Sequence, residues 1–355
     1  MSSHLSVQPG VASGSVFSTS RNVISQAPTR LQRGLDAAFR RSCYALAWFT
    51  ILLVTFIVLR IAVAAAPAIR QYGFGFLTGR VWDANAGQYG ILAQIWGTVY
   101  TSVLALVAGT AFGVAAAIFL SEGFLGTAVF SILKRFGLHL SPYWNRIPDQ
   151  LERILKELIE LLAAIPSVVY GLWGLFVVIP LIRPVCHWLH LQMGWFPFFS
   201  TDLSGPGVLP AVIVLAIMIM PTIAAISRDA LVSVPPKLRM AAYGLGATRW
   251  ESIFAVILPT AARGIAGGIV LAFGRALGET MALAMLVGNN NQIKASLFAP
   301  ANTIASLLAN SFGEATGLEV AALMYLSFIL MLLTLAINAV AEVILEKTGA
   351  ATRHL

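Results

Sequence analysis

Two oppositely charged residues interrupt a long apolar stretch of this 355-residue sequence. Arg275 and Glu279 stand four residues apart in the run GRALGET, residues 274–280, and lie on one face if that run is helical. An arginine at mid-membrane costs about 2.5–3.5 kcal/mol on insertion scales, and an ionised glutamate adds a similar cost. Two interpretations stay open: the residues neutralise each other as an internal pair, or Arg275 presents its guanidinium group to an oxyanion that crosses the membrane.

Glu279 and nearby hydroxyl groups add a hypothesis about selectivity. A carboxylate repels a fully ionised dianion, but it accepts a hydrogen bond from the proton that phosphate retains near neutral pH. Sulfate has no such proton, so we expect Glu279 to disfavour sulfate. Ser167, Tyr170 and Thr280 are candidate hydrogen-bond donors along the same path. The alternative for each is a hydroxyl satisfied within its own helix or by a neighbour.

The composition indicates which elements hold these residues. Hydrophobic residues make up 58% of the chain and charged residues 11%, whereas a soluble domain carries about 25% charged residues. We therefore predict an all-α polytopic membrane protein with six transmembrane helices. A cleaved signal peptide is the alternative for the first apolar segment, but its basic leader would be shorter. The segments long enough to cross about 30 Å of hydrocarbon are residues 44–66, 95–120, 158–182, 208–226, 265–287 and 320–340.

The basic residues predict the orientation of these helices. With six spans, 17 Lys and Arg residues fall on the side of the termini and 4 on the other side, which places both termini in the cytoplasm. The basic residues are scattered between apolar segments, so the net charge of +8 does not indicate a nucleic-acid partner. Cys43 and Cys186 fall on opposite sides of the bilayer in this topology, which excludes a disulfide, and no metal-ligand spacing is present.

The loop after the fourth span, residues 228–263, has its own pattern. Pro236 can open a helix, and Gly244 and Gly246 can end one. We predict a short helix, a turn and a second helix at the membrane surface. Pattern alone leaves two interpretations: the basic loop rests on anionic headgroups, or it binds a partner protein.

Ala241, Ala242 and Gly246, followed by the run VILP at residues 256–259, resemble the cytoplasmic "EAA" loop of ABC importer permeases. In that family the loop docks the membrane bundle onto a separate ATPase. Residues 162–176 and 274–282 resemble the phosphate-specific (Pst) permeases, and Met281 with residues 170–174 fits their C type. The docking residues implied by the resemblance are Ala241, Ala242, Gly244, Gly246, Ala247 and Thr248.

The resemblance implies a function and a set of partners. The chain would be a non-catalytic permease of the type I bundle in the cell inner membrane, forming an inorganic phosphate path with an A-type permease. Two copies of an ATPase and a periplasmic phosphate-binding protein would complete the complex, with ATP and Mg on the ATPase and no cofactor on this chain. None of the five lysines follows a glycine, so the Gly-Lys core of a phosphate-binding P-loop is absent. The substrate-path residues implied are Arg275, Glu279, Thr280, Ser167 and Tyr170.

The expected organisation is a disordered cytoplasmic tail over residues 1–40, a transmembrane permease domain over 41–345 and a cytoplasmic C-terminal tail over 346–355. Two features depart from the family pattern. Met240 replaces the acidic residue usual in the docking loop, which puts an ionic contact with the ATPase there in doubt, and the loop at residues 123–153 is longer than expected. Two other functions stay open: a proton-coupled secondary carrier of anions, and an ABC permease for another oxyanion such as sulfate or molybdate.

Overall fold

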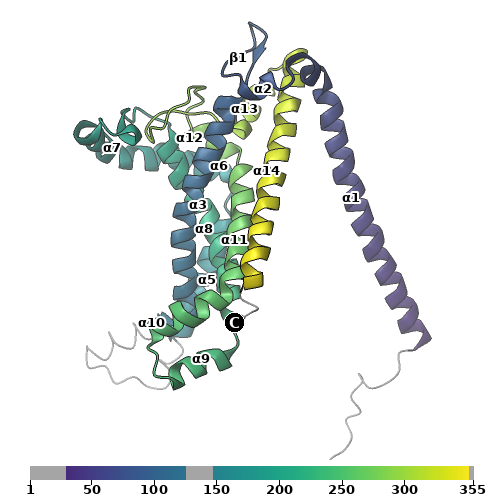
Figure 1. The fold of residues 1–355 in the computed structure, drawn as a ribbon, viewed down its shortest axis with the longest axis vertical. Coiled ribbons are helices and arrows are strands. Elements are labelled where there is room, and N and C mark those ends of the chain that lie inside the picture. The colour runs from purple at the N-terminus through teal and green to yellow at the C-terminus, as the bar shows by residue number, and fades with distance from the viewer. Residues whose placement is uncertain (1–28, 125–146, 352–355) are drawn as a thin grey trace, which may run out of the picture. The chain divides into compact units, whose positions relative to one another are not determined.

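The computed structural model describes residues 29–124 and 147–351, and these form a helical structure with one small β-hairpin (Figure 1). The hairpin pairs β1 (Trp82–Asp83) with β2 (Gln88–Tyr89) in antiparallel register. Two π-helical turns, η3 (Gly174–Val178) and η5 (Ile253–Ile257), and one 3-10 turn, η4 (Pro197–Phe199), join neighbouring helices. The α-helices are α1 (Arg30–Tyr72), α2 (Gly75–Thr78), α3 (Leu92–Ser121), α5 (Ile147–Ala164), α6 (Ser167–Trp173), α7 (Ile179–Met193), α8 (Val208–Val232), α9 (Pro236–Gly244), α10 (Arg249–Ser252), α11 (Leu258–Leu277), α12 (Met281–Leu286), α13 (Ile304–Ser311) and α14 (Leu318–Ala351).

Six helical segments in the described part of the chain are long and apolar enough to span a membrane, which confirms the predicted number. The third and fifth differ from their predicted positions. The third begins at Ser167 rather than residue 158, because Pro166 disfavours helical backbone at the residue before it and α5 ends at Ala164. The fifth covers Arg249–Leu277 rather than residues 265–287, so the second half of the expected docking loop is already helix.

The chain divides into two compact units, Met1–Val58 and Leu59–Leu355. In the first, the predicted disordered tail lies outside the described residues up to position 28, while its last part is already helical from Arg30. In the second, α14 continues to Ala351, and residues 125–146 of the long loop lie outside the described residues. Cys43 is exposed and Cys186 is buried, and both are free thiols.

Helix α8 packs at the centre of the second unit. An added Cβ at Gly109 or Gly113 of α3 would lie 2.8 or 2.9 Å from Ile219 or Ile223 of α8. An added Cβ at Gly264 or Gly268 of α11 would likewise lie 2.5 or 3.0 Å from the Cβ of Ala230 or Ile226 of α8. Small residues therefore let the backbones of α3 and α11 approach α8.

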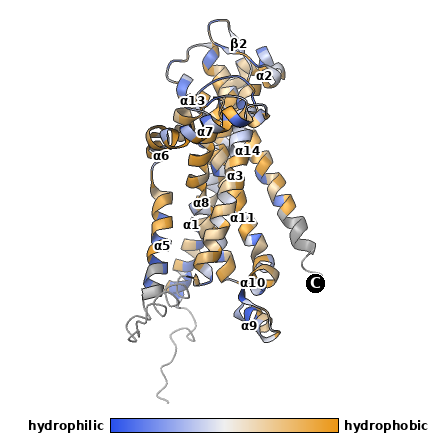
Figure 2. Cartoon of the chain, turned by 90° about the vertical axis from the view of Figure 1, so that its left-hand side faces the viewer, coloured by the Kyte–Doolittle hydropathy of each residue, from blue (hydrophilic) through white to orange (hydrophobic). Residues whose placement is uncertain are grey.

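The second unit has two polar ends. Figure 2 shows hydrophobic residues along the shafts of the helices and hydrophilic residues gathered at both ends. We call the end that carries α9 and α10 the docking end, and the end that carries the β1–β2 hairpin, α2 and α13 the hairpin end (Figure 1). The assignment of the docking end to the cytoplasm stays a prediction.

The hairpin end is held by a neutral, buried hydrogen-bond network. The Asn291 side-chain oxygen accepts hydrogen bonds from Gln94 at 2.8 Å and from Asn302 at 2.9 Å. The Thr98 hydroxyl accepts one from the Ile304 backbone at 2.9 Å. An added Cβ at Gly97 would lie 2.0 Å from the Asn302 carbonyl oxygen, so only glycine fits where α3 crosses this segment. The network fixes the start of α3 against the chain that follows α12.

Candidate functional site

The helix that carries Arg275 is interrupted directly after it. Helix α11 ends at Leu277, residues 278–280 form a break, and α12 starts at Met281. The expectation that Arg275 and Glu279 share one face of a continuous helix is therefore wrong. Gly278 explains the difference, because glycine favours helix ends, and here its N–H bonds back to the Gly274 carbonyl at 3.4 Å.

Arg275 lies in the last turn of α11, and its side chain is exposed. It has no salt bridge and no hydrogen bond to any residue in the part of the chain that the structure describes. The interpretation of Arg275 and Glu279 as an internal ion pair is thus not realised in this structure. A guanidinium group without a partner can bind an anion through two parallel N–H donors.

Glu279 and Thr280 occupy the break itself. The Glu279 carboxylate is half-buried and accepts a hydrogen bond from the Ala282 backbone N–H at 3.4 Å, at the start of α12. The Thr280 hydroxyl donates to the Gly278 carbonyl at 3.1 Å. The Thr280 hydroxyl is therefore satisfied by a neighbouring carbonyl, which was the alternative to a role on the path. The second carboxylate oxygen of Glu279 makes no hydrogen bond to the described residues.

Ser167 and Tyr170 lie on α6. The Tyr170 hydroxyl is satisfied by a 2.7 Å hydrogen bond to the Leu162 carbonyl. Ser167 is half-buried at the first turn of α6 and makes no side-chain hydrogen bond within the described residues. Of the three hydroxyl groups that the sequence predicts on the path, Ser167 is the one that stays available as a donor.

Helix α6 packs closely on α12, which brings the predicted path residues together. An added Cβ at Gly171 would lie 2.7 Å from the Met285 sulfur and 3.3 Å from the Ala282 Cα. The first turns of α6, the end of α11 and the start of α12 therefore form one region.

Ser102 of α3 supports this region, although it was not predicted as a site residue. Its hydroxyl is buried and donates to the Ala276 carbonyl at 3.3 Å, a carbonyl close to the end of α11. A hydroxyl group inside an apolar span was the available signal, but spacing along the chain does not identify its partner.

The second predicted site, at the docking end, has the expected helix, turn and helix. Helix α9 starts at Pro236 and ends at Gly244, and Gly246 adopts a φ of 84°, which favours glycine. Thr248 then caps α10 through a reciprocal pair of hydrogen bonds with Glu251.

The docking segment, which we define as α9, α10 and the turn between them (residues 236–252), is mostly exposed and partly apolar. Among its predicted docking residues, only Ala242 is buried, and Ala247 is half-buried, whereas Ala241, Gly244, Gly246 and Thr248 are exposed. Its apolar side chains include Leu245, 90% exposed, and Met240, 65% exposed. Exposed apolar residues beside small residues are typical of a surface that a partner covers.

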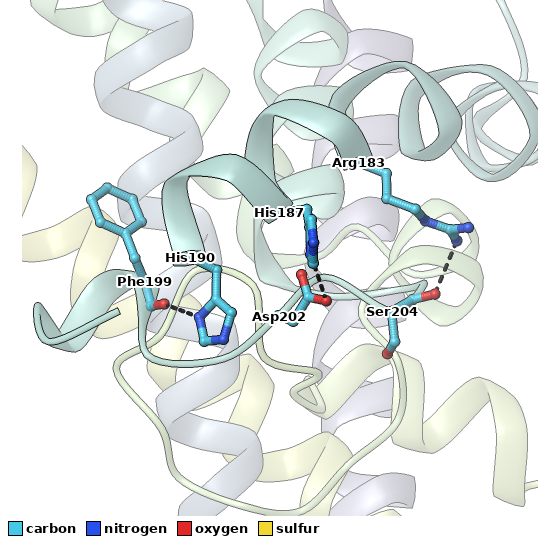
Figure 3. A network of polar contacts seen from close by, with 6 residues as sticks. All are labelled: Arg183, His187, His190, Phe199, Asp202 and Ser204. Carbon is cyan, nitrogen blue, oxygen red and sulfur yellow. Dashed lines mark hydrogen bonds and ion pairs between the residues drawn. The ribbon is translucent and has the colours of Figure 1, made fainter. Parts of the chain in front are cut away.

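Two histidines near the hairpin end, to which the sequence assigned no role, hold a loop to α7 (Figure 3). His187 pairs with Asp202 at 3.0 Å, and His190 bonds to the Phe199 carbonyl at 2.7 Å. The hydrogen bond from His187 holds the pKa of the Asp202 carboxyl below its usual range. No group of three or more potential metal ligands occurs among the residues that the structure describes.

Comparison with known proteins gives one family match and a consistent set of relatives. The family described as "Binding-protein-dependent transport system inner membrane component" matches residues 136–349. The phosphate transport system permease protein PstC of Pasteurella multocida is 38% identical over 88% of this chain and 92% of its own length. The probable phosphate transport system permease protein PstC of Methanocaldococcus jannaschii is 34% identical over 71% of this chain and 74% of its own length.

Two solved structures share the fold at low sequence identity. A bacterial ABC transporter involved in the import of the acidic polysaccharide alginate has a TM-score of 0.55 at 15% identity, over 90% of this chain and 99% of that chain. A bacterial alginate ABC transporter in complex with an alginate-bound periplasmic protein has a TM-score of 0.54 at 16% identity, over 86% of this chain and 94% of that chain. At this identity the likeness concerns the fold alone.

Proposed function

We infer the function of this chain from its family: it belongs to the binding-protein-dependent transport system inner membrane components and, among them, to the PstC phosphate permeases. The chain is the membrane-spanning permease subunit of an ATP-driven phosphate importer. Like its relatives it is a transport subunit rather than a catalyst, and it works with other components of an ABC transporter, an ATPase and a binding protein.

The observation that carries a mechanism is the state of Arg275. Its guanidinium group is exposed at the end of α11, next to a helix break and without a partner in the described residues. A charge in an apolar bundle is costly unless it serves a ligand or a path. Arg275 would bind phosphate in transit through two parallel hydrogen bonds, with Ser167 as a further donor from α6.

Glu279 would set selectivity at the same place. The backbone N–H of Ala282 holds one carboxylate oxygen, which leaves the other to accept the proton of a hydrogen phosphate. Sulfate cannot offer that hydrogen bond and would meet only repulsion. Thr280 and Tyr170 would shape the path, since their hydroxyl groups bond to the Gly278 and Leu162 carbonyls.

The finer partners follow from family analogy and the two ends of the bundle. An A-type permease would complete the path, and two copies of the ATPase would bind through the docking segments. The periplasmic phosphate-binding protein would bind at the hairpin end. Apolar side chains such as Leu245 and Met240 support an ATPase contact through shape and apolar area rather than through an ion pair.

Phosphate uptake tests the role of Arg275. The complete complex is reconstituted in proteoliposomes with ATP inside, the binding protein outside and labelled phosphate as the substrate. Loss of a charge-assisted bidentate contact is worth about 1.5–3 kcal/mol, so we expect Arg275→Ala to lower uptake by about 10- to 100-fold. Arg275→Lys keeps the charge but loses the planar pair of N–H donors, so its uptake rate should lie between those of Arg275→Ala and the wild type.

The matched control is Arg263→Ala, an exposed arginine on the same helix away from the break. It should leave uptake within about twofold. Normal uptake by both Arg275 variants would refute the binding role of this residue without touching the family assignment. Uptake by the wild-type complex that needs a proton gradient and not ATP would refute the importer itself.

Selectivity tests Glu279 separately. In competition between phosphate and sulfate, Glu279→Gln should lose discrimination against sulfate because the repulsive charge is gone. The same discrimination in the variant and in the wild type would remove this role from Glu279.

A further inference from the structure

A buried ion pair ties the docking segment to α3. Glu122 follows the last residue of α3, and its side chain is only 5% exposed. Its Oε1 accepts a 2.5 Å hydrogen bond from Nη1 of Arg239 on α9, a residue 117 positions later in the chain. The Arg239 side chain is 22% exposed. A carboxylate this far from solvent needs its partner, so the contact holds α9 firmly against the end of α3.

The second nitrogen of Arg239 extends the contact to α8. Nη2 donates to the Leu231 carbonyl at 3.0 Å, at the end of α8, where helix carbonyls lack partners within the helix. One guanidinium group thus joins the docking helix α9 to α3 and α8 together. Two separate donors in a fixed plane give this junction a defined geometry that a lysine could not reproduce.

Aromatic contacts tie α10 to the same end of α3. The Phe124 ring stacks on Trp250 at 5.0 Å between centroids, and the Arg249 guanidinium group lies 4.2 Å from the Phe124 centroid. The Phe119 ring of α3 also stacks on the Phe124 ring, with 6.2 Å between the centroids. Both helices of the docking segment are therefore joined to α3, through an ion pair and through stacked rings.

Helix α3 connects this junction to the region around Arg275. It runs without a break from Leu92 to Ser121, and its Ser102 hydroxyl holds the Ala276 carbonyl one residue after Arg275. At about 1.5 Å per residue, Ser102 and Glu122 lie about 30 Å apart along the axis. A displacement of the docking segment can thus reach the end of α11 through one rigid helix.

We propose that the Glu122–Arg239 ion pair couples the ATPase to the phosphate path, by making α3 move with the docking segment. Glu122 and Arg239 are positioning residues that touch neither ATP nor phosphate. The proposal rests on the proposed function, because it requires an ATPase at the docking end and a substrate near Arg275. It predicts that weakening the pair separates ATP hydrolysis from transport.

The test compares two rates in the reconstituted complex: phosphate uptake and ATP hydrolysis. In Glu122→Gln we expect ATP hydrolysis within about twofold of wild type and phosphate taken up per ATP hydrolysed at least fivefold lower. The matched control is Glu160→Gln, the same change in an exposed pair with Lys156 on α5, and it should leave the ratio unchanged.

Arg239→Lys is a second, milder variant if Glu122→Gln does not assemble. It keeps the charge and loses the geometry of the two donors, so the ratio should fall by about twofold or more. An unchanged ratio in an assembled variant, or uptake and hydrolysis that fall in equal proportion, would overturn the coupling role. Failure of the wild-type complex to take up phosphate with ATP would instead refute the proposed function, so the two failures are distinct.

Discussion

Two regions of the apolar bundle differ in their polar groups: the packing of α3 and α11 on α8, and the break at residues 278–280. In the packed region the contacts are neutral: glycines such as Gly109 and Gly264 let backbones approach, and buried hydroxyl groups bond to carbonyls. Beside the break, in the last turn of α11, the charged Arg275 is exposed and has no partner among the described residues. We therefore expect the packed helices to provide the stability of the chain, and under the proposed function the arginine beside the break would serve a ligand.

This contrast can be tested by the free energy of unfolding of the chain in detergent. Substitutions in the packed region should lower it, and substitutions of the unpartnered charge should not. Substitutions in the packed region would then change mainly stability, and substitutions of the unpartnered charge would change mainly transport.

The largest effect is expected at Gly97, where α3 crosses the segment before α13. An alanine Cβ would lie 2.0 Å from the Asn302 carbonyl oxygen, and the backbone on both sides would have to shift. Overpacking of this kind costs about 1–3 kcal/mol and sometimes more, so we expect Gly97→Ala to lose about 3 kcal/mol of unfolding free energy.

The matched control for Gly97→Ala is Gly267→Ala on α11, where an added Cβ meets no atom within 4 Å. This variant should be as stable as wild type or slightly more stable, because alanine favours helix more than glycine does. Equal losses in the two variants would show that close approach at α3 is not the cause.

An intermediate effect is expected at Ser102, which joins the packed region to the break. Ser102→Ala removes the hydrogen bond to the Ala276 carbonyl and should cost about 1 kcal/mol. The control is Ser327→Ala on α14, whose hydroxyl bonds to Leu323 within its own helix and joins no second element. Phosphate uptake should fall in Ser102→Ala only, and a fall in both would contradict a special role for this contact.

A smaller effect on stability, which depends on pH, is expected at the contact between His187 of α7 and Asp202 in the loop that follows α7. The hydrogen bond from His187 lowers the pKa of Asp202, so the stabilisation is present above the ordinary carboxyl pKa and is lost as pH falls through the lowered one. The difference in thermal stability between wild type and Asp202→Asn should therefore shrink at acid pH. In a His187→Ala background the Asp202 substitution should have less effect at neutral pH, and an equal effect would contradict the pairing.

The sequence predicts the number of spans and the docking segment well, because both depend on local signals. Long apolar runs give the spans, and Pro236 with Gly246 gives the helix and turn of the docking segment. The break after Arg275 was not predicted. The apolar residues that follow continue a helical pattern across the break.

Contacts between distant residues could not be predicted from spacing. Arg239 stands in the docking segment as one basic residue among several, and Glu122 lies 117 positions earlier with no local sign of its partner. The same holds for Ser102 and Ala276, which are 174 positions apart. The sequence names residue types that need partners, and only the fold decides which partners they meet.

The smallest effect on stability is expected at the residue with the largest expected effect on transport. Arg275→Ala removes a side chain that makes no hydrogen bond or salt bridge to the described residues, so its unfolding free energy should change by less than about 0.5 kcal/mol. Thermal unfolding of the purified chain measures this, with Arg239→Ala as the comparison because it leaves the buried Glu122 carboxylate unpaired and should be clearly destabilised. If Arg275→Ala lost as much stability as Arg239→Ala, both arginines would be structural, and the break would hold a hidden ion pair rather than a group kept for phosphate. Unchanged stability together with lost uptake would support the proposal that Arg275 serves the transported phosphate rather than the fold.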